Sequence, residues 1–334
     1  MPRRADLLTE TPPDAEVQPV RRKRRASGGI ECFVGLGIGL AGLLASRLGQ
    51  LWIGFDVFSH FTLQFALIAL AFLLGGLMPR ARLLTATVLL VLGIAGIGMW
   101  PHLASRGPWP AVAAAGGERA LKVASFNTLW VSEDADAVKA EILRLDADVL
   151  VLIEMGSAKR RILSQIRDRY PHQADCYDLD YCNFVVLSRL PITRTDARGI
   201  WRGPPYIRVK LGPEAGGLTV FGVHTTRFPY AERQLRHVTE IAKLIEATAG
   251  RKLVMGDFNA TPFSRIMTVL ENRAGLSRLT FLPTWPAQLG LPQIAIDHIL
   301  VSPGLRLLAP ARIGESAGSD HYPVVALIGV PLTP

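Results

Sequence analysis

Two patterns of apolar residues divide the chain. Between Ile30 and Trp100 apolar residues run almost without interruption, and only five charged side chains occur there: Glu31, Arg47, Asp56, Arg80 and Arg82. From Leu121 onward, short apolar runs alternate with amphipathic stretches. We therefore expect an apolar helical region and a globular domain, joined by a linker rich in Pro, Gly and Ala at residues 103–120.

The apolar region, residues 30–102, is predicted to form three transmembrane helices. A membrane span needs about 20 apolar residues, and Val57–Pro79 and Leu83–His102 meet this length without a formal charge. The first segment, Ile30–Gly49, has Glu31 and Arg47 near its ends, where long side chains can reach the membrane surface. A helical hairpin buried in a soluble protein is the alternative, and it would need a more amphipathic pattern.

Charge placement predicts the orientation of these helices. Residues 1–29 are polar and contain the basic run at 21–25, so we expect a disordered cytoplasmic tail. Arg80 and Arg82, between the second and third segments, should also be cytoplasmic. Three spans then place the globular domain outside the cytoplasm, which in a bacterium means a multi-pass inner-membrane protein with a periplasmic domain. The inverted arrangement, with a cytoplasmic domain, remains the alternative.

The globular domain, residues 121–334, has the pattern of a layered α/β sandwich. Its short apolar runs predict strands at 121–126, 149–153, 184–188, 206–211, 218–223, 253–255, 296–301 and 324–328. Amphipathic stretches predict helices at 134–144, 158–169 and 231–248. Many short strands with few helices favour sheets covered by helices.

Polar residues stand at the ends of several predicted strands, where a scaffold presents chemical groups. They are Asn127, Glu154, His224, Asp257, Asn259, Asp297, Asp320 and His321. Carboxylates gathered at apolar strand ends repel one another unless a cation lies between them. Mg²⁺ prefers carboxylate and amide oxygens together with water, so the set favours Mg²⁺, with Mn²⁺ as the alternative, over zinc.

Several short motifs follow one another in an order that is typical of a known protein superfamily. "GDFN" at 256–259 follows an apolar strand, "DH" at 297–298 opens the next, "SDH" at 319–321 precedes another, and "VVLSRLPI" spans 185–192. From Leu121 to Gly329 the chain resembles the endonuclease/exonuclease/phosphatase superfamily. That resemblance implies a four-layered α/β sandwich, two packed mixed sheets flanked by helices, and Mg²⁺-dependent hydrolysis of a phosphate ester.

The resemblance also implies roles for single residues. Glu154 would be the principal metal ligand, with Asn127 beside it and Asp320 as a second contact. Asp257 would orient or deprotonate the attacking water, and Asn259 would hold a phosphate oxygen or a metal-bound water. His321, fixed by Asp297, would stabilise the developing negative charge or act as acid or base. His224 would touch the phosphate from the opposite side, and its own carboxylate partner is uncertain.

Outside the motifs, Arg208 and Arg227 are candidate phosphate contacts, with ordinary surface positions as the alternative. Trp201, Phe228 and Trp285 are candidates to line the cleft, with packing in the core or an ordinary surface position as the favoured alternative. Cys176 and Cys182 flank a short polar loop. Disulfides persist in oxidising compartments, so an extracytoplasmic domain would allow these two to pair. Two unpaired cysteines are the alternative.

These observations leave the substrate open. A membrane-anchored phosphodiesterase or phosphatase, acting on a lipid head group, a nucleic acid or a small molecule, is the leading hypothesis. From Leu121 onward the chain has 25 basic and 21 acidic residues. This small excess of positive charge does not require a nucleic-acid substrate. The competing hypotheses are a nuclease, a cytoplasmic-facing version of the same enzyme, and a catalytically dead membrane scaffold. The lipid bilayer is a predicted partner, and no obligate protein partner is evident.

Overall fold

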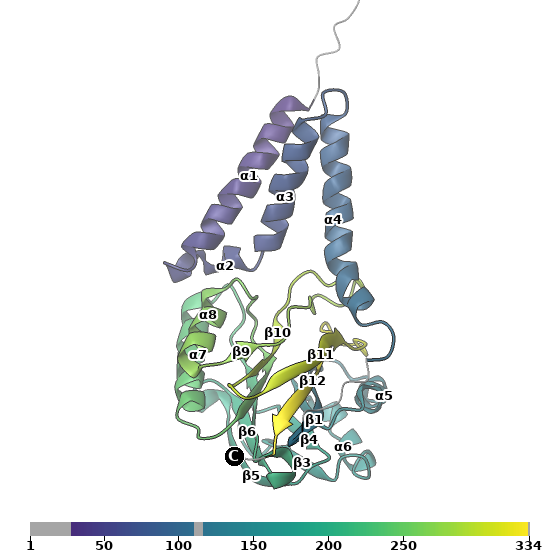
Figure 1. Ribbon diagram of the computed structural model, residues 1–334, viewed down its shortest axis with the longest axis vertical. Coiled ribbons are helices and arrows are strands. Elements are labelled where there is room, and N and C mark those ends of the chain that lie inside the picture. The colour runs from purple at the N-terminus through teal and green to yellow at the C-terminus, as the bar shows by residue number, and fades with distance from the viewer. Residues whose placement is uncertain (1–27, 110–115, 333–334) are drawn as a thin grey trace, which may run out of the picture.

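The computed structural model describes residues 28–109 and 116–332. Apolar helices stand on one end of a layered domain, and a short helix lies between the two (Figure 1). The predicted disordered tail, residues 1–29, falls almost entirely outside the described residues. The helices are α1 (Gly29–Leu48), α2 (Asp56–Ser59), α3 (Thr62–Gly76) and α4 (Arg82–Ala104), with a single 3₁₀ turn at Ile53–Phe55.

The helical layer differs from the prediction in its second segment. The stretch predicted as one helix, 57–79, is broken between α2 and α3, and the helical pieces on the two sides differ in direction by 60°. Thr62 Oγ1 donates to Ser59 O at the break. Helices α1 and α4 are long and apolar enough to cross a membrane, and the bent pair makes a third candidate if it counts as one span.

Glycines allow the apolar helices to approach closely. A Cβ atom added at Gly39 of α1 would lie 2.5 Å from the backbone nitrogen of Ala69 in α3. Added at Gly75 of α3, it would lie 2.6 Å from Ala86 Cβ in α4. Small residues at such contacts are typical of helices that associate in lipid, where close packing replaces the hydrophobic effect as the source of stability.

The domain contains two six-stranded mixed sheets. The first has the order β11 (Arg306–Ile313), β12 (Val324–Pro331), β1 (Glu118–Asn127), β2 (Val149–Ile153), β4 (Val185–Ser188) and β3 (His172–Asp175). The second has the order β5 (Ile192–Arg198), β6 (Tyr206–Leu211), β7 (Thr219–His224), β8 (Lys252–Asp257), β10 (Asp297–Val301) and β9 (Ser277–Arg278).

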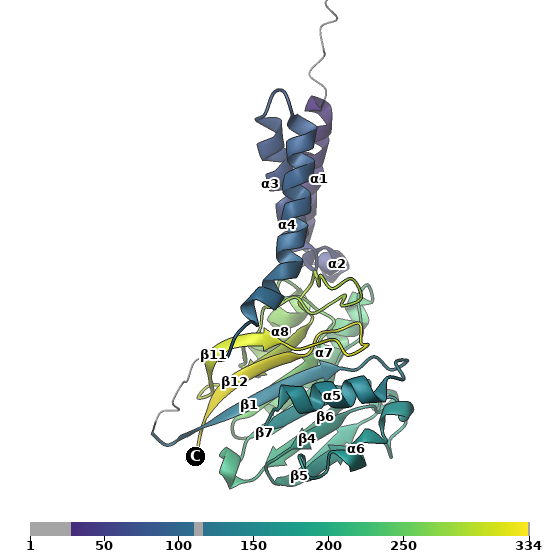
Figure 2. The same cartoon turned by 90° about the vertical axis from the view of Figure 1, so that its right-hand side faces the viewer.

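The two sheets pack face to face, and helices cover their outer faces (Figure 2). Val123 and Val151 of the first sheet share a buried core with Val220 and Met255 of the second. The first sheet is covered by α5 (Ala135–Leu145) and α6 (Ile162–Gln165), the second by α7 (Ala231–Glu246) and α8 (Arg265–Ala274). Short 3₁₀ turns occupy Ser157–Lys159, Ile200–Arg202 and Pro213–Ala215. The predicted four-layered α/β sandwich is confirmed.

Strand direction and register place the site. β1 and β2 run parallel, as do β7 and β8, so the carboxyl ends of each pair meet at one edge. In the second sheet Asp257 is paired with His224 on one side and with Asp297, the first residue of antiparallel β10, on the other. Register alone therefore brings three of the predicted site residues into one row.

Candidate active site

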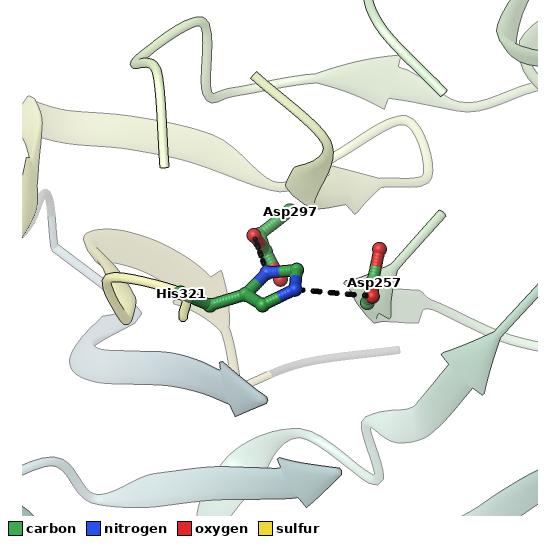
Figure 3. A group of neighbouring side chains, drawn as sticks. All are labelled: Asp257, Asp297 and His321. Carbon is green, nitrogen blue, oxygen red and sulfur yellow. Dashed lines mark hydrogen bonds and ion pairs between the residues drawn. The ribbon is translucent and has the colours of Figure 1, made fainter. Parts of the chain in front are cut away.

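A histidine between two carboxylates forms the centre of the site (Figure 3). His321 Nδ1 donates to Asp297 Oδ2 at 2.8 Å, and Thr284 Oγ1 donates to the same oxygen at 2.6 Å. On its other side, His321 Nε2 lies 3.8 Å from Asp257 Oδ2. The bond to Asp297 leaves Nε2 as the ring nitrogen that faces Asp257 and the cleft.

Burial and nearby charges shift the pKa of His321 in opposite directions. Burial by itself would lower the pKa of His321, but the carboxylates of Asp297 and Asp257 outweigh it and raise the pKa to about 10. Burial, together with the nearby charge of Asp297, raises the pKa of Asp257 to about 6. His321 is thus held as an imidazolium, and Asp257 is a more basic carboxylate than usual, suited to accepting a proton.

Glu154, Asn127 and His224 form the facing wall. Asn127 Nδ2 donates to Glu154 Oε1 at 3.2 Å and to Asp257 Oδ2 at 3.0 Å, so one amide joins the two carboxylates. His224 Nε2 lies 3.5 Å from Glu154 Oε1 and 3.6 Å from Asp257 Oδ2. Glu154 and Asp257 are therefore the carboxylates nearest to His224, whose partner the sequence left open.

The backbone of Glu154 has a left-handed conformation, with φ of 55°. This conformation costs energy in a non-glycine residue, and hydrogen bonds hold it in place. Trp130 N donates to Glu154 Oε2 at 2.8 Å, and Thr128 Oγ1 donates to Glu154 O at 3.0 Å. Burial opposes ionisation of Glu154, but the charge of His224 and the hydrogen bonds from Trp130 and Asn127 outweigh it and lower the pKa.

A buried lysine that the sequence analysis did not identify supports this wall. Lys159 Nζ donates to the carbonyl oxygens of Thr128, Leu129 and Ser132 at 3.0, 2.6 and 2.9 Å. The side chain is fully buried. The ammonium therefore fixes the loop after β1, whose Trp130 amide binds Glu154, and acts on the site through that loop.

Hydrogen bonds also fix the loop after β8, as they fix the loop after β1. Asn259, with φ of 47°, donates its backbone N–H to Asp257 Oδ1 at 2.8 Å and its side-chain Nδ2 to Thr225 O at 3.1 Å. Gln234 of α7, also missed in the sequence, donates to the carbonyl oxygens of Phe258 and Asn259 at 2.9 and 3.0 Å. Asn259 thus orients Asp257 in addition to facing the cleft.

The oxygen donors of the site fit a hard divalent cation. Asp320 Oδ2 accepts from Trp285 Nε1 at 3.2 Å, whereas Asp320 Oδ1 is buried without a hydrogen-bond partner among the described residues. Asp257, Asp297 and His321 offer ligand atoms within 4.8 Å of one another. Within that group, His321 Nδ1 and Asp297 Oδ2 are already bound to each other. Glu154 and Asp320 are the better candidates, because the oxygen of Asn127 accepts from Leu129 N at 3.0 Å and its Nδ2 faces Glu154.

These groups open into one cleft of about 710 Å³. Its lining includes Glu154, His224, Asp257, Asn259, Asp320 and His321, together with Arg227, Phe228, Tyr230, Arg233 and Trp285. Asn127 and Asp297 do not line the cleft, but they form hydrogen bonds to residues that do: Asn127 to Glu154 and Asp257, and Asp297 to His321. The side chain of Trp201 lies outside the described part of the structure.

Arg208 does not join the other predicted site residues. It lies within β6, where its guanidinium donates to Asp196 Oδ2 at 2.8 Å and to Thr248 Oγ1 at 3.1 Å. Arg227, in the loop after β7, does line the cleft.

Cys176 and Cys182 are joined by a disulfide with a Cα–Cα distance of 5.5 Å. The bridge closes the turn between β3 and β4, and both side chains are buried in the core between the sheets. Among the described residues Cys32 of α1 is the free cysteine.

The sandwich, its strand-end carboxylates and the paired histidine define a metal-dependent hydrolase that acts on phosphate ester bonds. The chain belongs to the Endonuclease/Exonuclease/phosphatase family, whose sequence model matches residues 124–321. The relationship expected from the motifs is therefore confirmed, together with the enzyme class.

Solved structures agree on the fold. Humanized TDP2 of D. rerio, carrying 14 mutations, has a TM-score of 0.54 at 14% identity, covering 63% of this chain and 98% of its own. D. rerio TDP2 with a single strand DNA product gives 0.53 at 14% identity, with the same coverage. The structure named SmcL gives 0.50 at 19% identity, covering 62% of this chain and 98% of its own. No curated protein matches the sequence.

Proposed function

We propose that the protein is a membrane-anchored, Mg²⁺-dependent phosphoesterase that hydrolyses its substrate by in-line attack of water. The observation that carries this proposal is the position of Asp257. Its Oδ2 lies within 3.8 Å of His321 Nε2 and 3.6 Å of His224 Nε2, and Asn127 binds it at 3.0 Å. One basic carboxylate thus stands among groups that attract both water and phosphate oxygens.

Each side chain has a role in this proposal. Asp257 orients the attacking water and accepts its proton, and Asn259 holds Asp257 in position. His321, kept protonated by Asp297, stabilises the negative charge that develops on the phosphate or the leaving oxygen. His224 contacts the phosphate from the facing wall, and Arg227 is the candidate second contact.

Glu154 and Asp320 would hold the cation, and Asn127 would orient Glu154 through its Nδ2 hydrogen bond. A bound Mg²⁺ supplies Lewis acidity and neutralises the phosphate oxygens. The all-oxygen donor set supports Mg²⁺, and Mn²⁺ would suit the same oxygens. The family and the donor set both support a divalent metal, so the choice of ion is the part to be measured.

We also propose that the helices span a membrane and that the domain lies outside the cytoplasm. The start of α1 lies against the α3–α4 turn, because a Cβ on Gly28 would be 3.2 Å from Leu83 N. The turn between α3 and α4, which contains Arg80 and leads into Arg82, lies at the end of the helices far from the domain (Figure 1). Positive residues mark the cytoplasmic side, and the disulfide is consistent with an oxidising compartment on the other side.

A substrate panel with the purified full-length protein tests the chemistry. It should contain plasmid DNA, RNA, sphingomyelin, inositol phosphates and bis(p-nitrophenyl) phosphate, each with Mg²⁺ or Mn²⁺ and beside Asp257→Asn. Hydrolysis that needs metal and Asp257 supports the proposal. Inertness toward every substrate would instead favour a dead scaffold, and selective cleavage of DNA or RNA would favour a nuclease.

Orientation is tested separately. An alkaline phosphatase reporter fused to the C-terminus should be active, because that reporter folds only outside the cytoplasm. Activity from a cytoplasmic reporter at the same position would establish the inverted arrangement.

A further inference from the structure

The mouth of the cleft lies at the base of the apolar helices. Phe228 lines the cleft, and its ring packs against His60 at 4.7 Å and against Phe61 at 6.3 Å between centroids. Both residues belong to the break between α2 and α3. Trp285, on the same cleft, lies 6.4 Å from Phe228. The wall of the cleft is thus continuous with the helical layer.

Buried polar contacts fix the domain against the helices. Asp56, fully buried in α2, accepts from Ser264 Oγ at 2.6 Å and from Arg265 N at 2.7 Å, at the start of α8. Thr261 N donates to His60 Nδ1 at 3.2 Å. These contacts join the helices to the loop that follows Asp257 and Asn259, so the direction in which the cleft faces is set.

A second set of contacts lies on the other side of the helical layer. The ring nitrogen Nε2 of His102, in α4, lies 3.0 Å from Gly290 O. Gln64 of α3 donates to Gln293 O at 2.9 Å. The helices therefore contact the domain at both α8 and the 290–293 loop, so the cleft has a defined position relative to them.

Exposed apolar side chains gather at the level of this junction. From the helical layer come Leu51, Trp52 and Trp100, which are 78%, 65% and 60% exposed. From the domain come Phe263 and Leu289, 38% and 82% exposed; Phe263 O binds Gln50, and Leu289 precedes the Gly290 that contacts α4. Tryptophan is enriched where membranes meet water. We refer to these five residues as the junction ring.

We infer that the substrate is a phosphate ester carried by a lipid of the bilayer leaflet next to the domain. The polar head enters the cleft, where Arg227 and Arg233 offer positive charge to the anion, while the acyl or prenyl chains stay at the junction ring. A free polyanion would need a basic track leading away from the cleft, and the near balance of 25 basic and 21 acidic residues from Leu121 onward gives little support for one. This inference rests on the proposed hydrolase activity and membrane anchoring.

The test uses the full-length protein reconstituted into vesicles. The vesicles contain phosphatidylethanolamine, phosphatidylglycerol and phosphatidic acid, and phosphorus-31 NMR follows the products. Dihexanoyl forms of the same lipids, kept below their micelle concentration, and bis(p-nitrophenyl) phosphate serve as soluble substrates. We expect at least one long-chain lipid to be hydrolysed about tenfold faster than its short-chain form at equal amount, because membrane embedding raises its effective concentration at the cleft.

Two variants that each introduce a negative charge, one in the junction ring and one away from the cleft, provide a matched comparison. Leu289→Glu should lower the ratio of lipid to soluble hydrolysis by about tenfold, because a carboxylate resists placement against hydrocarbon. Leu143→Glu introduces the same change on an exposed position of α5, away from the cleft, and should leave the ratio unaltered.

The outcomes separate this inference from the function it rests on. Turnover of soluble esters with intact lipids, or equal rates for long and short chains, would overturn the lipid assignment and leave the hydrolase in place. A ratio that falls equally in both glutamate variants would also overturn it. If no substrate is hydrolysed, the proposed function itself is refuted, and the lipid assignment with it.

Discussion

Replacing Asp297 by asparagine removes one charge from the site and very little else. The side-chain oxygen of asparagine can still accept from His321 Nδ1 and Thr284 Oγ1, the two donors now 2.8 and 2.6 Å away. The geometry should therefore persist while the histidine loses its nearest negative charge. The experiment isolates the electrostatic part of the His321–Asp297 pair.

The magnitude follows from the charge balance around His321. A pKa raised from 6.5 to about 10 corresponds to roughly 5 kcal/mol in favour of the imidazolium. Asp297 lies nearer to the ring than Asp257 does, at 2.8 against 3.8 Å. Even with half of that stabilisation lost, His321 would stay protonated at neutral pH, so the expected loss is in its stabilisation of negative charge in the transition state. A positioned acid or base group typically contributes at least about 100-fold, so kcat should fall by about 100-fold.

Initial rates with bis(p-nitrophenyl) phosphate at saturating Mg²⁺ measure this fall, and thermal unfolding shows whether the fold is intact. Asp196→Asn is the matched control, because Asp196 also binds an O–H and an N–H group but lies beside Arg208, outside the cleft. It should leave kcat within about twofold, as surface substitutions usually do. A well-folded Asp297→Asn enzyme with kcat within threefold of wild type would refute the role given to His321.

Three further predictions concern the rest of the site. Arg227→Ala should raise KM by about tenfold through loss of a charged phosphate contact. Arg208→Ala is the control and should leave kcat and KM unchanged. Steady-state kinetics of the two variants measure this, and a larger effect from Arg208→Ala than from Arg227→Ala would contradict it. Lys159→Met should lower the free energy of unfolding by about 2–4 kcal/mol, because three carbonyl oxygens lose a buried donor, and denaturant titration measures it. Because burial lowers the pKa of Lys159 from 10.5 to about 8, the folded state binds fewer protons than the unfolded state between those values, so the wild type should gain stability relative to this variant as pH rises from 8 to 10.5. Chelation by EDTA should abolish hydrolysis and added Mg²⁺ should restore it, and activity that survives chelation would exclude the metal.

The sequence predicted the elements whose apolar pattern is strong. The buried strands of both sheets and the amphipathic α7 lie within a few residues of their predicted bounds. β5 was missed because its exposed sequence, ITRTDAR, is mostly polar, as befits an edge strand. β11 contains Pro310 and two register shifts, which hide its alternation. The helix expected at 158–169 is instead a 3₁₀ turn and the short α6, at the point where Lys159 turns inward.

The site was predictable where function coincides with a strand end. Asn127, Glu154, His224, Asp257, Asp297 and His321 were recognisable because an apolar run stops at or beside each of them. Lys159 was not, because its carbonyl partners lie about 30 residues away and backbone oxygens leave no mark in a sequence. Arg208 was overrated for the opposite reason: its charge is visible in the sequence, whereas its pairing with Asp196 is not.

The buried Asp56 has a consequence for how this protein can be divided. It supplies the acceptor for the first free N–H of α8 and for the hydroxyl of Ser264, so a helix of the hydrolase domain is completed by a residue from the apolar region. A fragment that begins at Glu118 would leave those donors without their acceptor and would uncover the face that His60 packs against. The apolar helices and the hydrolase domain are therefore not interchangeable modules, and an unrelated apolar helix fused to the domain would not supply this acceptor.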